Sequence, residues 1–361
     1  MVMGMPSITI EFQQLGKTAI QRSEKGILGM IIVDAAADLQ GEHLLTSASM
    51  ISTVLPGLGV ANKAQIQLAF MGYITPPRRI IVFVIDDSET TLENALHYFA
   101  TQELDYIIGP PEMAAADVQS IVSWVKSERL NGGFPKAVLP NIVADNDAII
   151  NFATEKIIAG ENTFTTNEYC SRIAGIIAGT PMTISATYAP LPEVTNCTRL
   201  TKLEMDAAVD AGKFIIWHDG RQVLTGRAVN SLTTLTQEKG DRFKKIKIIE
   251  AMDMMARDIK TAARVSYIGK YANSYDNKCL LIMAILGYLE GLEMSGILVR
   301  GSSVVEIDVD ENELYLKAQG IDTSDMSEQE LKESDTGSSV FLLIRVIILD
   351  AIEDIKIKVT I

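Results

Sequence analysis

The sequence is poor in the residues from which most catalytic and metal sites are built. Its 361 residues include only three cysteines and three histidines. The cysteines (Cys170, Cys197 and Cys279) are too few for a disulfide framework and fit a reducing compartment. No Cys-x-x-Cys, His-Glu-x-x-His or Gly-x-Ser-x-Gly motif occurs. We therefore expect no catalytic residues, no metal and no cofactor, and predict that the protein is not an enzyme.

Three partial motifs occur, and each lacks a residue that its chemistry requires. A phosphate-binding loop would need glycine where Glu11 stands, and a dinucleotide fingerprint would need glycine or alanine at Asn62. A calcium loop opening at Asp308 would need glycine at Glu313 and a bidentate glutamate at Gln319. None of the three therefore indicates a ligand site.

Net basic charge and long apolar runs are also missing. Lysine and arginine number 32 against 46 aspartates and glutamates, so the formal net charge is −14. A protein that covers nucleic-acid phosphates needs a basic face, so we expect no nucleic-acid partner. The most apolar helical stretch, Cys279–Leu289, is shorter than the ~20 residues that cross a bilayer. The first residues show no secretion signal, so we expect a cytoplasmic protein without membrane insertion.

Strand and helix patterns alternate through the first two thirds of the chain. Ile80–Ile85 is apolar throughout, which is typical of a strand covered on both faces, and Thr90 and Glu93 have the spacing of a capping box. This alternation predicts a parallel α/β sheet. The expected elements are strands at 27–33, 80–85, 106–108 and 136–139, a helix at 112–129, a helix at 203–211 and a hairpin around Asp219-Gly220.

The pattern changes after a polar stretch at residues 231–240, and we place a domain boundary near residue 230. A long helix is expected from about Arg242 to Ile268, followed by a second helix capped at Asp276. Strand-like runs at 297–307 and 340–349 complete an α+β region. The fold class is thus α/β in the first part and α+β overall, with domains at 30–229 and 230–349 and arms at 1–29 and 350–361.

Both ends of the chain have the two-residue period of a half-buried strand. Either the two ends pair with each other as edge strands, or strands are exchanged between neighbouring copies. We favour exchange, with hinges at Gln13–Lys25 and Ala351–Glu353. The apolar positions of these strands are Ile8, Ile10 and Phe12 at the beginning and Ile355, Ile357, Val359 and Ile361 at the end.

Charge is unevenly distributed along the second part of the chain. Residues 306–335 hold eleven acids and two lysines, a net charge of −9, whereas residues 239–270 hold nine bases and four acids, a net charge of +5. A basic helix is usually a solvated face, but it can also meet an acidic partner.

Three stretches together resemble the contractile tail sheath proteins of bacteriophages, in the compact form found in defective prophages and phage-tail-like bacteriocins. They are Met5–Ile10 continuing to Ile27, Gly220–Ser231, and Lys245–Lys278. The resemblance implies an α/β outer domain, an inner C-terminal domain that packs with the N-terminal arm, and arms that add strands to neighbouring subunits.

The resemblance also implies a structural function and its partners. Copies would polymerise as six-fold rings stacked around a tail tube, and contraction would drive the tube through a cell envelope. The expected partners are the protein itself, the tail tube protein, and baseplate and tail-end proteins. Synthesis would take place in the bacterial host cytoplasm and assembly in the tail of a phage or phage-like particle.

A further hypothesis assigns surfaces within such an assembly. Lys244, Lys245 and Lys247 on the basic helix would face the tube, and the acidic segment would meet another sheath subunit. The alternatives are an α/β enzyme of unknown substrate and another self-assembling phage structural protein.

Overall fold

The computed structural model describes residues 20–23, 25–86 and 90–360. The chain forms two compact units. The larger unit contains the described residues of 23–255 and takes in the chain again from residue 350 onward. The smaller unit contains residues 256–349 together with residues 20–22.

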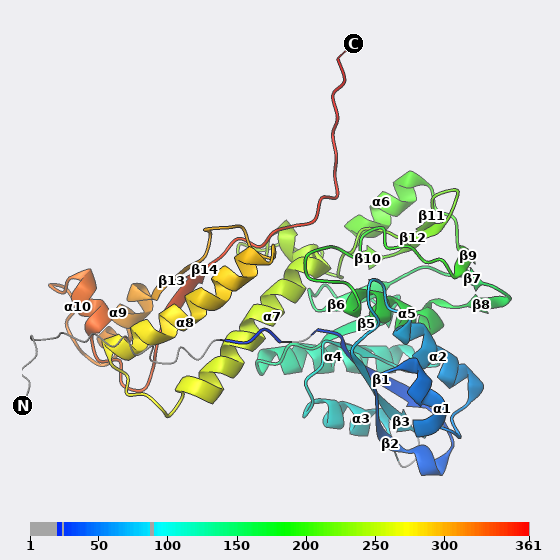
Figure 1. The fold of residues 1–361 in the computed structure, drawn as a ribbon, viewed down its shortest axis with the longest axis horizontal. Helices are drawn as coiled ribbons and strands as arrows, with labels where there is room; N and C mark the ends of the chain where they lie inside the picture. The colour runs from blue at the N-terminus through cyan, green and yellow to red at the C-terminus, as the bar shows by residue number, and fades with distance from the viewer. Residues whose placement is uncertain (1–19, 24, 87–89, 361) are drawn as a thin grey trace, which may run out of the picture. The chain divides into compact units, whose positions relative to one another are not determined.

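A seven-stranded sheet forms the centre of the larger unit (Figure 1). All neighbouring strands are parallel except the edge strand β2, which is antiparallel to β3. The predicted α/β class with a parallel sheet is therefore confirmed. In spatial order the strands are β10 (Lys213–Phe214), β6 (Ile149–Phe152), β5 (Lys136–Pro140), β4 (Tyr106–Ile108), β1 (Ile27–Val33), β3 (Arg79–Ile85) and β2 (Gly41–Leu45).

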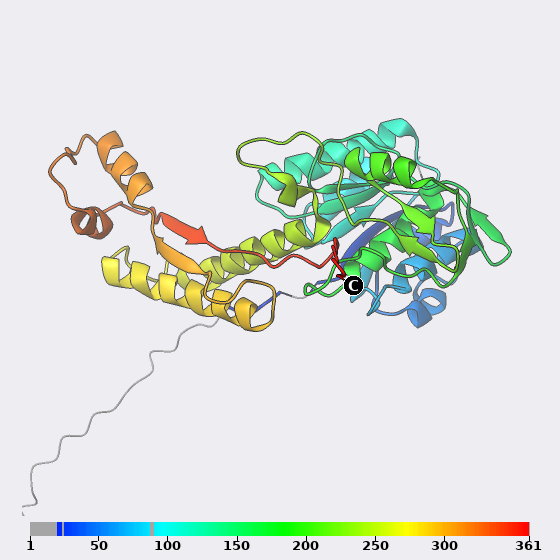
Figure 2. The same ribbon diagram turned by 90° about the horizontal axis from the view of Figure 1, so that it is seen from above.

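Helices cover both faces of this sheet, as the continuous apolar strands predict. Helices α2 (Val60–Phe70) and α5 (Thr166–Ala178) pack on one face, where Leu28, Met30 and Ile32 of β1 point. Helices α3 (Leu92–Phe99) and α4 (Ala115–Leu130) pack on the other, where the intervening residues of β1 point. Figure 2 shows the sheet edge-on between these two helical layers.

Smaller elements surround the sheet. The predicted hairpin is present, because Asp219 accepts hydrogen bonds from the backbone amides of Arg221 (2.7 Å) and Gln222 (2.8 Å), and Gly220 adopts φ +103°. The remaining elements of the unit are η1 (Ala37–Leu39), η2 (Ala48–Met50), α1 (Ile51–Val54), β7 (Ile157–Ala159), β8 (Asn162–Phe164), β9 (Val194–Asn196), α6 (Lys202–Asp210), β11 (Ile216–His218), β12 (Val223–Thr225) and η3 (Asp241–Lys244).

The smaller unit is built on long helices and a two-stranded sheet. Helix α7 (Ile246–Ala262) begins in the larger unit and ends in the smaller, where a π-helix, η4 (Ala263–Tyr267), follows it. Within the smaller unit, the Tyr288 hydroxyl of α8 donates a 2.5 Å hydrogen bond to Asp258 of α7. The other elements are α8 (Tyr275–Met294), β13 (Val304–Ile307), α9 (Val309–Ala318), α10 (Glu328–Glu333) and β14 (Leu342–Arg345).

Two predicted helix caps differ from those in the structure. The capping box of α3 uses Thr91 and Asn94, one residue later than predicted, because the helix begins at Leu92. Helix α8 is capped by Ser274, which accepts from the amide of Asn277, and Asp276 lies in its first turn. Since Ser and Asp both favour helix N-termini, composition alone did not separate them.

Residues 230–255 pack with the larger unit. The amide of Ser231 donates to the carbonyl of Ile149 in β6 (2.7 Å), and the amide of Asn230 donates to the carbonyl of Lys244 (2.9 Å). The predicted domain boundary near residue 230 thus lies inside the larger compact unit, whose limits fall after Met255 and before Asp350.

Two buried carboxylates hold the first part of α7 against the amino-terminal edge of the sheet. Glu250 accepts a hydrogen bond from Tyr106 (2.5 Å) and pairs with Lys25 (2.7 Å). Asp253 pairs with Arg129 (2.8 Å) and Lys136 (3.0 Å). Burial alone would raise the pKa of Asp253, but Lys136 and Arg129 outweigh it, so that the pKa lies below its ordinary value of 3.8.

Replacing Asp253 by asparagine should therefore destabilise the larger unit by about 3–5 kcal/mol, because the buried Lys136 and the partly buried Arg129 lose their partner. Urea unfolding at pH 7 measures this loss. Since the folded pKa is lowered, the wild-type advantage is present above pH 3.8 and should shrink as the pH falls below it. Asp206→Asn, which removes the exposed Lys202–Asp206 pair, is the control and should change stability little. Equal loss in both variants would contradict the prediction.

Candidate assembly surfaces

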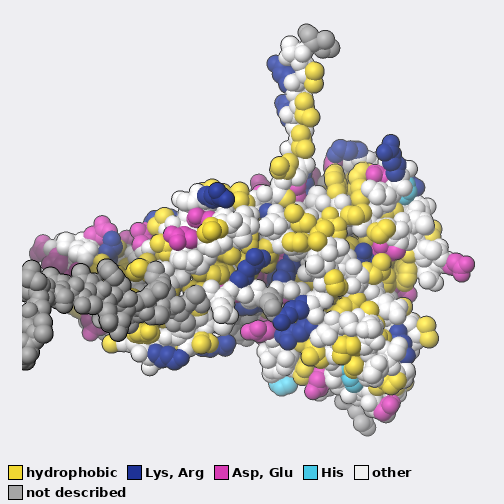
Figure 3. Space-filling model, viewed as in Figure 1, with side chains coloured by type: hydrophobic (Ala, Val, Ile, Leu, Met, Phe, Trp, Pro, Cys, Tyr) yellow, Lys and Arg dark blue, Asp and Glu magenta, His cyan; other side chains and the backbone are white. Residues whose placement is uncertain are grey.

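The C-terminal arm belongs to the larger unit and lies exposed. Residues 349–360 contain no strand, and the side chains of Ile355, Ile357 and Val359 are 75%, 77% and 78% exposed. In Figure 3 its apolar side chains lie along one side and its lysines along the other, as the alternating sequence predicts. The remaining predicted exchange residues, Ile8, Ile10, Phe12 and Ile361, lie outside the described part of the chain. Exchange therefore stays a prediction.

The arm has the chemistry of an edge strand that lacks a neighbour. Fully burying an aliphatic side chain is worth roughly 1.5–3 kcal/mol, and this gain is not realised at Ile355, Ile357 or Val359 within the subunit. A strand with unpaired amides and carbonyls is also a template for pairing with another chain. Both features favour addition of this segment to a sheet.

A sheet that could accept another strand lies in the smaller unit. Strands β13 and β14 pair antiparallel, with Val304 opposite Arg345 and Ile307 opposite Leu342. Among the described residues no third strand joins them. Two-stranded sheets are marginally stable in water, and a third strand with an apolar face makes them stable.

The three lysines predicted to face a tube have different surroundings. The Lys244 side chain is 30% exposed and pairs with Asp241 at 3.2 Å. Lys245 pairs with Asp350 (2.5 Å) and Glu353 (3.1 Å) of the C-terminal segment. Lys247 is buried, and burial lowers its pKa. The triplet is therefore not a single solvated basic face. The helix predicted from Arg242 to Ile268 is shorter in the structure, so that Lys244 lies in η3, Lys245 follows η3, and of the three only Lys247 lies in α7.

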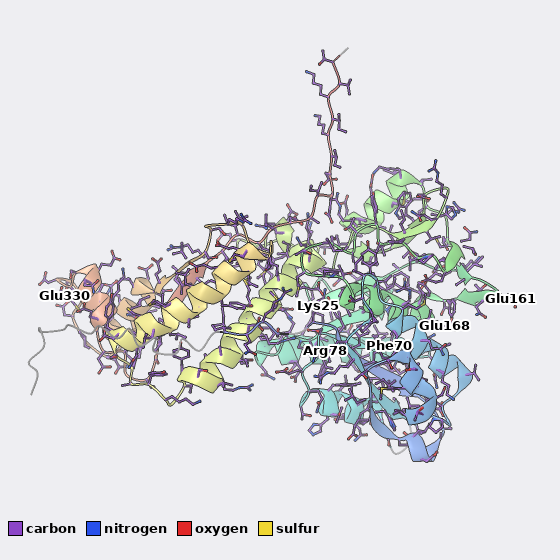
Figure 4. The ribbon with its side chains drawn as sticks, viewed as in Figure 1. Lys25, Phe70, Arg78, Glu161, Glu168 and Glu330 are labelled. Atoms are coloured by element: carbon purple, nitrogen blue, oxygen red, sulfur yellow. The ribbon has the colours of Figure 1, made fainter. Side chains whose placement is uncertain are left out.

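Several acidic residues of the segment 306–335 cap helices or form ion pairs within them. Asp308 accepts from the amide of Glu311 and caps α9, and Glu330, labelled in Figure 4, forms the capping box of α10 with Ser327. Lys317 pairs with Glu313, and Lys332 pairs with Glu328, in each case one helical turn away. The residues resembling a calcium loop thus begin a helix, and in the described chain no three His, Cys, Asp or Glu residues gather as metal ligands would.

The carboxyl edge of the parallel sheet, where many α/β proteins bind ligands, is filled by its own loops. Asp34 accepts hydrogen bonds from the amide of Gly59 and the side chain of Asn62, both at 2.9 Å. A cavity of about 10 Å³ between β1, β4, α2 and α5 remains there. Ligand pockets commonly measure ~300–1,000 Å³, so this cavity cannot hold a dinucleotide. The partial fingerprint at Gly57–Asn62 therefore serves loop structure.

The sequence did not reveal the residues that bind the start of the C-terminal arm. Arg227 and Thr187 contact Glu353 and Asp354 although more than 120 positions separate them along the chain. The only signal available was the clustering of Asp350, Glu353 and Asp354 before the alternating run. None of the helices in the described chain combines the length and apolar character needed to cross a bilayer.

Comparison with known proteins gives matches along most of the chain. Residues 86–231 match a domain described as the phage tail sheath protein central domain, and residues 238–361 match the phage tail sheath C-terminal domain. The tail sheath protein of Clostridium phage phiCD119 is 39% identical and aligns over 99% of each chain. Protein YqbK of Bacillus subtilis is 26% identical over 49% of this chain and 39% of its own.

Solved structures show the same fold at low sequence identity. The contracted helical sheath of the anti-feeding prophage has a TM-score of 0.73 and 13% identity, and 99% of each chain is covered. The sheath tail protein of Desulfitobacterium hafniense has a TM-score of 0.69 and 15% identity, with coverage of 84% of this chain and 94% of that chain. The contracted PVC sheath of an extracellular contractile injection system has a TM-score of 0.68 and 11% identity, with coverage of 100% and 98%.

Removal of residues 355–361 should leave the free energy of unfolding of the subunit unchanged, because the described side chains of this segment are largely solvated. Urea unfolding of dilute protein measures this. A longer truncation that ends the chain at Leu349 also removes Asp350 and Glu353, which pair with Lys245. This truncation should lower the free energy of unfolding. A large loss in the shorter truncation would show that the arm contacts its own subunit.

Proposed function

The chain belongs to the phage tail sheath family, and from this premise we propose that it polymerises as stacked six-fold rings around a tail tube and contracts to drive that tube through a cell envelope. The observation that carries the proposal is the 39% identity to a phage tail sheath protein over the full length of both chains. The family is structural, which supports a role without catalysis.

Strand exchange is the contact that we propose to link the copies. The arm of one subunit would add to the β13–β14 sheet of another, burying Ile355, Ile357 and Val359 and pairing the backbone groups of both partners. The exposed alternating arm and the two-stranded sheet support this proposal from the two sides of the contact. Because donor and acceptor are different surfaces, the contact is head-to-tail and can extend into a helix.

Contraction requires two packings of the same subunits, the extended one held behind a kinetic barrier. Exchanged strands would keep the copies connected while the globular units repack. The proposed partners besides the protein itself are the tube, the baseplate and tail-end proteins. We further propose synthesis in the bacterial host cytoplasm and assembly into the tail of the particle.

For the tube contact, Lys244 is the residue of the predicted triplet with the greatest exposure. Lys245 is paired with the arm, and Lys247 is buried. Reversing all three charges would therefore disturb the subunit as well as any tube contact, and a single substitution is more informative.

Loss of the apolar face of the arm should abolish polymerisation. Ile355→Gln with Ile357→Gln removes two buried anchors of the proposed exchanged strand, and negative-stain microscopy should show dispersed subunits in place of hollow cylinders. The matched control, Lys356→Gln with Lys358→Gln, changes the opposite face by the same residue type and should still form cylinders. Normal cylinders from the apolar-face variant would contradict strand exchange.

Lys244→Glu should reduce sedimentation of the protein with purified tail tubes, because it reverses the charge offered to an acidic tube surface. Its self-assembly without tubes should be unchanged. Lys202→Glu, at an exposed lysine of α6, controls for net charge. Equal tube binding by Lys244→Glu and wild type would exclude Lys244 from the tube contact.

A further inference from the structure

The C-terminal arm is attached to the larger unit by three acidic residues at its root. Lys245 lies 2.5 Å from Asp350 and 3.1 Å from Glu353. Arg227 lies 2.5 Å from Asp354 and 3.7 Å from Glu353. Two cations therefore face three carboxylates within five residues of chain, immediately before the alternating strand.

Glu353 is the centre of this contact. Its side chain is 5% exposed, whereas Ile352 beside it is 87% exposed. One carboxylate oxygen accepts a 2.6 Å hydrogen bond from the Thr187 hydroxyl, and the other forms the ion pairs with Lys245 and Arg227. A buried carboxylate is tolerated only when it is paired, so these partners and not the apolar neighbour determine the path of the chain.

The groups that bind Glu353 are themselves held together. The Thr187 hydroxyl accepts from the amide of Ala228 (3.0 Å), next to Arg227. The amide of Ile246, next to Lys245, donates to the carbonyl of Ala228 (3.2 Å), and Val229 and Lys245 form a β-bridge. Three segments distant in sequence thus form one fixed site, which we call the arm seat (Thr187, Arg227 and Lys245).

The electrostatics of the arm seat agree with its geometry. Burial alone would lower the pKa of Lys245, but the neighbouring carboxylates of Asp350 and Glu353 raise it, so the lysine stays charged. The outer pair of Arg227 with Asp354 is largely solvated and contributes little. The buried contact with Glu353 therefore decides how firmly the root is held.

We infer that the arm seat fixes the point and direction at which the C-terminal arm leaves the subunit, so that its free part begins after Asp354. This inference rests on the proposed strand exchange and makes Thr187, Arg227 and Lys245 positioning residues for it. With the root held in this way, the hinge of the arm lies between Asp354 and Ile355, and not in the segment Ala351–Glu353 that the sequence predicted.

The seat restricts the volume that the exchange strand can search. Residues 355–361 reach about 25 Å from a fixed Asp354, whereas the twelve residues 350–361 would reach about 40 Å if the root were free. Effective concentration falls with roughly the 3/2 power of tether length, and a free root also loses its direction. Releasing the root should therefore raise the critical concentration for polymerisation by roughly two- to fivefold.

The test measures root mobility and polymerisation separately. Nitroxide labels are placed at Ile352→Cys, within the root, or Ile357→Cys, beyond it, in a Cys279→Ser background, since Cys170 and Cys197 are buried. In dilute protein the label at 352 should be restricted and the label at 357 mobile. Lys245→Met should make the label at 352 as mobile as that at 357, and Lys245→Arg should not. Glu353→Gln, which removes from the arm the charge that pairs with Lys245 and Arg227, gives a second variant if Lys245→Met folds poorly.

The same seat variants, without labels, are then polymerised and pelleted over a concentration series. Lys245→Met should raise the critical concentration severalfold and Lys245→Arg should restore it. A mobile residue 352 in the wild type, or a released root with an unchanged critical concentration, would overturn the inference. If the arm variant Ile355→Gln/Ile357→Gln polymerises normally, strand exchange itself fails, and the mobility measurement still decides whether the seat holds the root.

Discussion

The exposed, amphipathic C-terminal arm is the constraint on which the rest of this structure depends. Ile355, Ile357 and Val359 gain their burial energy only against another surface, and their backbone groups need partners as well. The smaller unit contains a two-stranded sheet, which a third strand would stabilise. The proposed addition of the arm of one copy to the sheet of another would meet both requirements and would link folded subunits into a polymer.

Buried ion pairs supply the rigid parts around this adaptable contact. Glu250 and Asp253 hold the start of α7 against strands β4 and β5. Glu353 holds the root of the arm at Lys245, just before α7. Buried pairs add little net stability compared with apolar packing, but they demand one geometry. In the proposed contraction these ion pairs would fix the points from which segments move, a role that the net charge of −14 does not reveal.

Periodicity allowed much of the fold to be predicted. Strands at Ile27–Val33 and Tyr106–Ile108 and the hairpin at Asp219 follow from apolar runs and turn residues, which act locally. Helix caps were displaced by one or two residues because neighbouring Ser, Thr and Asp compete for the same role. The strand-like run 297–307 shortened to β13 because pairing, which periodicity does not contain, decides where a strand begins.

The sequence by itself determined the α/β class, the apolar face of the C-terminal arm and the tail sheath resemblance, since each is written in contiguous residues. Only the tertiary structure decided what the charges do. Lys245, which looked like part of a solvated basic helix, contacts a carboxylate more than a hundred residues later, and Arg227 and Thr187 join it. Ion pairing depends on distance in space, and no pattern along the chain records which distant side chains folding brings within 4 Å of each other.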